Sequence, residues 1–247
     1  MAAAKKNIET NLKQRLVEGL KVLTGEGVLT GSGHLSVRIP GTENFLINPR
    51  FPGVLATPKD ICTVNADGKR IAGKGPIPSE TFIHSCIYRA RPDVKSVLHC
   101  HPRYAILMGL QETGLIPFNR EARIFADGVP VFPNSMGINT EGLANVMVQA
   151  LGAHYALFLK AHGVVVVGPG IEGTCVSAIQ LERACEDQLF LMSFSTPQPL
   201  AEKDRGRVEA RLENPYRAWP YLLYKHKVKS PSRIRADIRS LPEGEHY

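Results

Sequence analysis

The chain has 247 residues, of which 43% are hydrophobic and 21% charged, and its formal net charge is +7. This composition is that of a globular protein and excludes a disordered or fibrous chain. No apolar stretch approaches the roughly 18 residues that a transmembrane helix needs, so we expect no membrane span. The basic charge favours anionic partners. Because no zinc-finger spacing or RNA-binding signature accompanies it, we expect a small anionic substrate and no nucleic acid.

The cysteines and the N-terminus indicate the cellular compartment. The five cysteines are odd in number and include no C-x-x-C pair. The first residues, Met-Ala-Ala-Ala-Lys-Lys, have no apolar segment behind the lysines, unlike a secretory signal. We therefore expect a cytoplasmic protein with reduced thiols.

The first half of the chain alternates helical and β-like patterns. Apolar spacing predicts an amphipathic helix over 6–27, closed by glycines. A second helix is predicted to begin at residues 79–80 and to end before Pro92. The remaining predicted elements of this half are strands at 34–38, 44–47, 61–64 and 94–99 and a short helix at 102–110.

The second half continues the alternation and then changes character. It is predicted to hold strands at 130–132, 156–160 and 163–168 and helices at 140–151 and 171–192. Beyond Pro197 the sequence becomes polar and basic. We therefore expect a catalytic domain over 1–197 and a C-terminal extension over 198–247. Within this extension, Trp219, Tyr221 and Tyr224 either pack on the exterior, which we favour, or close a site as a lid or subunit contact.

The short connections between the early strands determine the fold class. The loop between strands 45–47 and 61–64 is too short for a crossover helix, so the two strands must pair antiparallel. The predicted fold is α/β: an α/β/α sandwich with a central, largely antiparallel sheet.

Three histidines are candidate metal ligands. His99 and His101 follow a buried strand, whose period of two points both imidazoles to the same face. His162 lies in a tight break between two apolar strands, where we expect Gly163 to let the backbone turn. Three imidazoles leave an open coordination position on Zn, Mn, Fe or Co, as a catalytic metal needs. Spacing alone also fits histidines that are merely structural.

Glu80 is the second candidate, and two interpretations remain open for it. It follows Ser79 at the start of a predicted helix, where a carboxylate stabilises the helix end. If it faces the metal instead, it is a general acid/base for a metal-bound substrate.

Four segments together resemble the class II aldolase/adducin family. They read Gly-His-Leu-Ser-Val-Arg at 33–38, Pro-Ser-Glu at 78–80, His-Cys-His at 99–101 and Ala-His-Gly at 161–163. The combination is far more specific than any one motif. The resemblance covers roughly residues 8–195. It implies an α/β/α sandwich that forms a homotetramer with active sites at subunit interfaces.

The resemblance also implies roles for the candidate residues. A divalent metal would be held by His99, His101 and His162, and Glu80 would be the general acid/base. The adducin branch of the family lacks the metal histidines and is non-enzymatic. Because this chain keeps all three, we expect an enzyme.

The chain departs from the sugar-phosphate aldolases of the family where they bind phosphate. Their motif asparagine is His34 here, and their Ser-Ser pair is Pro78 and Ser79, so polar donors are lost. Their Thr-Gly turn is replaced by Asn-Pro-Arg-Phe at 48–51. The guanidinium of Arg50 suits a planar carboxylate, although a solvated loop charge remains the alternative, and Phe51 beside it suits an aromatic ring.

This pattern is similar to the decarboxylase branch of the family, which acts on hydroxypyridine dicarboxylates and dihydroxyphthalates. We therefore hypothesise a metal-dependent lyase of aromatic compound catabolism that decarboxylates an ortho-hydroxylated aromatic acid. Glu80, or another acid such as His34, protonates the ring carbon. The expected substrate contacts are Arg50, Ser79, Ser36 and Phe51.

Other reactions fit the same scaffold. A class II aldolase would cleave a hydroxy-oxo acid or a sugar derivative, and a dehydratase or epimerase would use similar enolate chemistry. A non-catalytic adducin-like module is the alternative outside enzymology.

Overall fold

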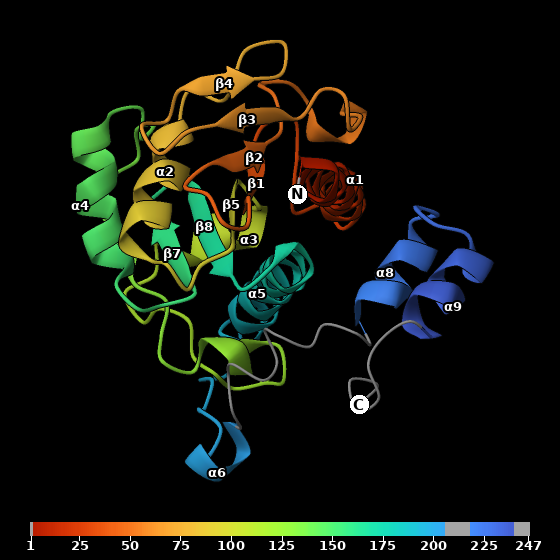
Figure 1. The fold of residues 1–247 in the computed structure, drawn as a ribbon. Coiled ribbons are helices and arrows are strands. Elements are labelled where there is room, and N and C mark those ends of the chain that lie inside the picture. The colour runs from red at the N-terminus through yellow and green to blue at the C-terminus, as the bar shows by residue number, and fades with distance from the viewer. Residues whose placement is uncertain (1, 206–217, 240–247) are drawn as a thin grey trace.

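The computed structural model describes residues 2–205 and 218–239. Within these residues one sheet has the strand order β4-β3-β2-β1-β5-β8-β7-β6 (Figure 1). Its pairings are antiparallel except for that of β6 with β7, which is parallel. The strands are β1 (His34–Arg38), β2 (Phe45–Ile47), β3 (Cys62–Val64), β4 (Arg70–Ala72), β5 (Ser96–Cys100), β6 (Val131–Phe132), β7 (Ala156–Leu159) and β8 (Gly163–Gly168).

Helices cover both faces of this sheet, so the predicted α/β/α sandwich is confirmed. One layer is formed by α2 (Thr81–Ala90) and α4 (Glu141–Leu151), and the other by α1 (Ala2–Gly25), α3 (Arg103–Met108) and α5 (Ile171–Leu191). The remaining elements are the 3₁₀ turns η1 (Gly53–Leu55) and η2 (Ala122–Phe125) and the helices α6 (Glu202–Arg205), α8 (Ala218–Lys225) and α9 (Pro231–Arg239). None of the described helices combines the length and apolar character needed to cross a bilayer.

Alternation along the strands separates two kinds of residue. In β1, Leu35 and Val37 belong to the core shared with α1 and α5. The intervening His34 and Ser36 point to the opposite face, where their side chains meet those of α2. β1 therefore presents an apolar side to one helical layer and a polar side to the other.

The polar ends of three central strands, β1, β5 and β8, lie together at one end of the sheet. β1 starts at His34, which lies opposite His99 near the end of β5. β8 starts at Gly163, which lies close to Cys100, the last residue of β5. The first turn of α2 begins beside this end, directly after Glu80. The sheet thus collects the predicted site residues at one place.

The C-terminal helices pack on the α1 and α5 side of the body. Trp219 is 8% exposed and joins that core, whereas Tyr221 and Tyr224 are each 60% exposed. This agrees with packing on the exterior. Part of the predicted extension, residues 206–217 and 240–247, lies outside the described residues. The division into 1–197 and 198–247 stays a prediction.

Candidate metal centre

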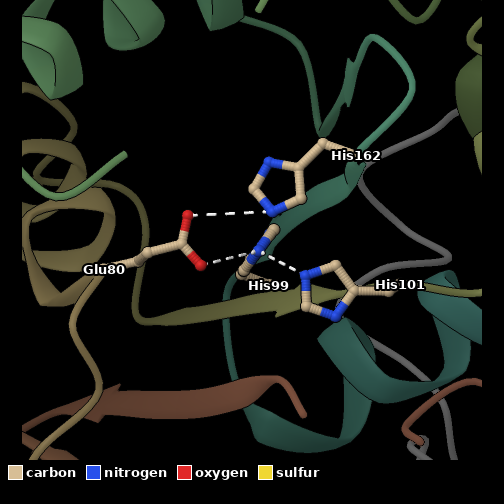
Figure 2. A group of neighbouring side chains, drawn as sticks. All are labelled: Glu80, His99, His101 and His162. Carbon is tan, nitrogen blue, oxygen red and sulfur yellow. Dashed lines mark hydrogen bonds and ion pairs between the residues drawn. The ribbon is translucent and has the colours of Figure 1, made fainter. Parts of the chain in front are cut away.

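Three imidazoles and one carboxylate converge at the ends of the central strands (Figure 2). The candidate ligand atoms of Glu80, His99, His101 and His162 all lie within 4.8 Å of one another. The Nε2 atoms of His99 and His101 are 3.0 Å apart. Glu80 places Oε2 at 3.4 Å from Nε2 of His99 and Oε1 at 3.8 Å from Nε2 of His162. The predicted triad is therefore assembled around one point, with Glu80 beside it.

The turn that carries His162 depends on close packing. Ala161 adopts a left-handed conformation with φ of 57°, which is uncommon for a residue with a side chain. Gly163 has no such φ. A Cβ at Gly163 would instead clash with the carbonyl oxygen of Cys100 and lie 2.8 Å from Cδ2 of His101. The expectation that Gly163 makes the turn is thus corrected: Ala161 turns the chain, and Gly163 lets β8 approach the ligand strand.

The hydrogen bonds behind the imidazoles fit a metal. Nδ1 of His99 lies 3.1 Å from the carbonyl oxygen of Val164, which can only accept, so this nitrogen carries the proton. Nε2 of His99, which faces Glu80 and His101, is then the nitrogen whose lone pair would bind a metal. Oγ of Ser32 lies 3.1 Å from Nδ1 of His101 and orients the second ring similarly. A cation between these donor atoms relieves the repulsion of their lone pairs.

The protonation states also suit a divalent ion. Burial, together with the neighbouring His99 and His162, lowers the pKa of His101 to about 4. Burial and His99 lower the pKa of His162 as well. Both rings are therefore neutral at pH 7, which is the form that binds a metal. Three imidazoles and a carboxylate suit several first-row divalent ions, so the donor set leaves the identity of the metal open.

Glu80 does not cap its helix. It precedes α2, but its side chain makes no capping hydrogen bond. Its Oε1 instead accepts the backbone N–H of Ile138 at 2.8 Å. Burial raises the pKa of Glu80, but its contacts with His34 and His99 and the hydrogen bond from the Ile138 N–H outweigh it and hold that pKa well below its usual range. The capping interpretation is wrong, and an ionised carboxylate faces the triad.

A cavity of about 210 Å³ adjoins these groups. Most predicted site residues line it, including His34, Arg50, Phe51, Ser79, Glu80 and His101. Burial lowers the pKa of His34 to about 4, so the ring is neutral, and its Nε2 lies 3.9 Å from Oε2 of Glu80. The cavity therefore joins the candidate acid/base groups to the loop that carries Arg50.

Asn48 anchors that loop, a role that the sequence did not reveal. Its side-chain oxygen accepts the backbone N–H of Leu35 at 2.8 Å, and its amide nitrogen donates to the carbonyl oxygens of Gly33 and Pro49. The side chain is fully buried. A buried asparagine in a turn is the only sequence signal of such an anchor, and its partners become known only once β1 and β2 are paired.

Ser36 requires a correction. It is fully buried and does not line the cavity. Its hydroxyl lies 2.6 Å from Nδ1 of His84 and 2.7 Å from the hydroxyl of Tyr88. Ser36 follows His34 by two residues on the same face of β1, but it lies deeper between the sheet and α2. It therefore cannot contact substrate in the cavity as expected.

Residues 14–189 match the Class II Aldolase and Adducin N-terminal domain. A 3,4-dihydroxyphthalate decarboxylase of Arthrobacter keyseri is 29% identical over 185 residues, which cover 69% of this chain and 74% of that protein.

Two solved structures resemble the fold. An aldolase II superfamily protein from Pseudomonas syringae superposes with a TM-score of 0.78 at 24% identity, covering 90% of this chain and 94% of that one. An L-fuculose 1-phosphate aldolase from Glaciozyma antarctica gives a TM-score of 0.74 at 26% identity, covering 88% and 92%. The matched domain spans all eight strands of the described sheet, parts of both helical layers and all four converging side chains. The chain belongs to the class II aldolase/adducin family.

Proposed function

We propose that this enzyme is a metal-dependent decarboxylase of an aromatic acid that carries a hydroxyl group ortho to the departing carboxylate. The observation that carries the proposal is the lining of the cavity. Arg50 and Phe51 share it with Ser79 and Glu80, next to His101. A guanidinium can grip a second carboxylate with two parallel hydrogen bonds, and a phenyl ring can cover a flat substrate.

The size of the cavity supports a small substrate. About 210 Å³ is below the range of roughly 300–1,000 Å³ that is typical of drug-sized ligands. A single aromatic ring with its substituents is therefore a better match than a larger molecule. The similarity to 3,4-dihydroxyphthalate decarboxylase supports the same class of substrate.

The chemistry assigned to the chain begins with Glu80 as a carboxylate. It accepts the proton of the substrate hydroxyl and passes it to the ring carbon that bears the carboxylate. The carbon–carbon bond then breaks, carbon dioxide leaves, and the electron pair returns to the ring and its oxygen, which takes a proton from solvent. The net change is loss of carbon dioxide and gain of one proton on carbon. His34, whose Nε2 lies 3.9 Å from Oε2 of Glu80, stays beside the carboxylate throughout.

His99, His101 and His162 would hold the metal. A divalent cation, when bound, supplies positive charge next to the substrate oxygen and so favours the electron-rich state that forms as the bond breaks. The family's other chemistry, aldol cleavage, needs the same stabilisation. The similarity to an L-fuculose 1-phosphate aldolase keeps aldol cleavage as the second candidate.

The test compares the two reactions in one preparation. Metal-loaded protein is incubated with 3,4-dihydroxyphthalate and, separately, with L-fuculose 1-phosphate, and carbon dioxide and aldehyde are measured. We expect carbon dioxide from the aromatic acid and no aldehyde from the sugar phosphate. Aldehyde release without carbon dioxide would overturn the proposal in favour of an aldolase.

The predicted homotetramer belongs to the same proposal. Within the described residues, Nδ1 of His162 is buried without a hydrogen-bond partner, which is unusual for a ring held so close to a site. Because the chain itself encloses this nitrogen, the homotetramer is proposed on the family resemblance and not on this atom. Light scattering of the full chain measures the mass, and a monomer of 27.1 kDa would contradict the assembly.

A further inference from the structure

A row of four buried polar side chains runs behind Glu80. Nδ1 of His34 lies 2.6 Å from Nε2 of His84, and Nδ1 of His84 lies 2.6 Å from Oγ of Ser36. That oxygen lies 2.7 Å from the hydroxyl of Tyr88. None of the four residues is more than 5% exposed. Burying so many polar groups is unfavourable unless each is hydrogen-bonded, so the row acts as one connected unit.

The row follows from two matching periodicities. Glu80, His84 and Tyr88 are spaced four residues apart and lie along one side of α2. His34 and Ser36 are spaced two residues apart and lie on one face of β1. The helix and the strand pack together, so their polar stripes interlock. The serine of the Gly-His-x-Ser-x-Arg segment therefore serves this row, and its histidine joins the row to the cavity.

Neighbouring side chains pack against the row and fix its rings in place. Phe45 stacks on the ring of His84, with ring centres 6.2 Å apart. At the far end the guanidinium of Arg38 lies 4.7 Å from the centre of the Tyr88 ring, and its Nη2 donates to the Tyr88 carbonyl oxygen at 2.6 Å. Burial lowers the pKa of His84 well below its usual value, so the ring is neutral and carries a single N–H.

The two ends of the row determine the direction of its hydrogen bonds. Only one proton can lie between the ring nitrogens of His34 and His84. If it belonged to His34, Nε2 of that neutral ring would turn a lone pair toward the carboxylate of Glu80, 3.9 Å away. If it belongs to His84, Nε2 of His34 presents its N–H to Glu80 instead, which is the attractive arrangement.

The second arrangement satisfies every other group as well. His84 then has a bare Nδ1, which accepts the hydroxyl proton of Ser36. The oxygen of Ser36 in turn accepts the hydroxyl proton of Tyr88. Each donor then has an acceptor, and the row runs in one direction from Tyr88 to Glu80; the Ser36 hydroxyl also lies 3.5 Å from the carbonyl oxygen of Val97, a longer contact than the 2.6 Å to His84.

We propose that His84 is a positioning residue that holds His34 in the tautomer with its proton on Nε2, directed at Glu80 and the cavity. Ser36 and Tyr88 fix the orientation of His84. A flipped tautomer would remove the only hydrogen-bond donor that His34 offers to the site. The effect on catalysis rests on the proposed function, whereas the tautomer itself does not.

The tautomer is measurable without any substrate. Nitrogen-15 NMR of the histidine rings distinguishes a protonated from a bare nitrogen, and a His34→Gln variant identifies the signals of His34. At neutral pH, in the metal-free protein and after addition of Zn²⁺, we expect His34 to be protonated at Nε2 and bare at Nδ1. A proton on Nδ1, or equal populations of the two tautomers, would overturn the proposal.

Two variants of His84 separate positioning from packing. His84→Leu fills similar space but donates nothing, whereas the amide nitrogen of His84→Gln can still donate to His34. We expect His84→Leu to lose the single tautomer and to lower kcat about tenfold to 100-fold, with KM changed less than about twofold. His84→Gln should restore both the tautomer and most of kcat. His154, whose Nδ1 lies 3.1 Å from the carbonyl oxygen of Gly128 outside the cavity, gives the control His154→Leu, which should change neither quantity.

The outcomes separate this proposal from the proposed reaction. If the aromatic acid releases no carbon dioxide but the spectra show the predicted tautomer, the reaction is wrong and the positioning role stands. If His84→Leu keeps the single tautomer, or if His84→Gln loses kcat as fully as His84→Leu does, the positioning role is wrong. Circular dichroism confirms that each variant is folded, and the wild-type spectrum tests the tautomer even if His84→Leu does not fold.

Discussion

The cavity joins two parts that are built in different ways. The part that carries the triad belongs to the sheet: His99 is fully buried on β5, and its ring is fixed by the carbonyl oxygen of Val164. The part that carries Arg50 is a loop. Phe51 is 38% exposed there, and the loop is held through Asn48 and through the N–H of Arg50, which donates to the carbonyl oxygen of Pro76.

This difference separates chemistry from recognition. Charge stabilisation requires groups that do not move as the reaction proceeds, and strand ends provide such groups. Substrate choice depends on side chains that can be exchanged without unfolding the protein, and loops provide those. We therefore expect changes in the sheet-borne part to abolish turnover for every substrate, and changes in the loop-borne part to alter which substrate is used.

The largest effect is expected from the metal ligands. His99→Ala, His101→Ala or His162→Ala removes one of three imidazoles, so metal affinity should fall by more than about 100-fold and turnover should be lost. Elemental analysis of the purified variants measures the metal, and carbon dioxide release measures turnover. His154→Ala is the matched control and should keep full metal content. A His99→Ala protein that retains stoichiometric metal would contradict the assignment.

Glu80→Gln should strongly reduce turnover but retain the metal. The amide keeps the shape of the side chain and loses the ability to accept and return a proton. Such groups contribute about 10²–10⁴ in rate, so kcat should fall by that factor. Metal analysis and kcat are measured on the same sample. If the variant loses its metal as His99→Ala does, Glu80 is a metal ligand like the three histidines and not the acid/base group.

The sequence predicts the sheet-borne part far better than the loop-borne part. Strands at β1, β2, β3, β5, β6, β7 and β8 follow from apolar runs and turn residues. Histidines at strand ends make the triad a candidate, and the family resemblance assigns it to a metal. β4 was not predicted, because its three residues are exposed and carry no alternating pattern. The contact between His34 and His84 needs β1 and α2 to pack first, so spacing along the chain cannot reveal it.

The roles of Glu80 and Ser36 show the same limit. A glutamate at a helix start and a serine in a strand both have ordinary structural explanations, and only the packed structure decides between these and a functional role. The structure gives Glu80 no capping bond and turns its carboxylate toward three imidazoles, which supports the functional role proposed for it. The hydroxyl of Ser36 is hydrogen-bonded to His84 and Tyr88, which favours a supporting role for this residue.

A more selective effect is expected in the loop. Arg50→Ala removes a charged hydrogen-bond donor worth about 1.5–3 kcal/mol, so KM for an aromatic diacid should rise by roughly tenfold to 100-fold. KM for the corresponding monoacid should change much less, because it has no second carboxylate to bind. Arg50→Lys keeps the charge without the planar fork and should fall between. Equal increases for both substrates would show that Arg50 acts by general attraction and not as a clamp.

A third region is expected to affect neither chemistry nor recognition. Glu26, just after α1, has a side chain only 5% exposed and binds the C-terminal helix α8. Its carboxylate lies 2.6 Å from Nζ of Lys225 and from Nε2 of His226, and 2.7 Å from Nη2 of Arg183 on α5. Burial raises the pKa of Glu26, but these three partners outweigh it and lower the pKa to about 2.

The smallest effect on activity should therefore accompany a clear effect on stability. Because the pKa of Glu26 is lower in the folded state, its stabilising effect is complete above about 4.5 and is lost as the pH falls toward 2. Glu26→Gln should lower Tm at pH 7, with a difference from wild type that shrinks below pH 4.5 and leaves kcat unchanged. Asp93→Asn, which removes the exposed carboxylate of the pair with Arg91, is the control and should change Tm less. If Glu26→Gln lowers kcat as well, the C-terminal helices influence the cavity, and this third region is not independent of the catalytic one.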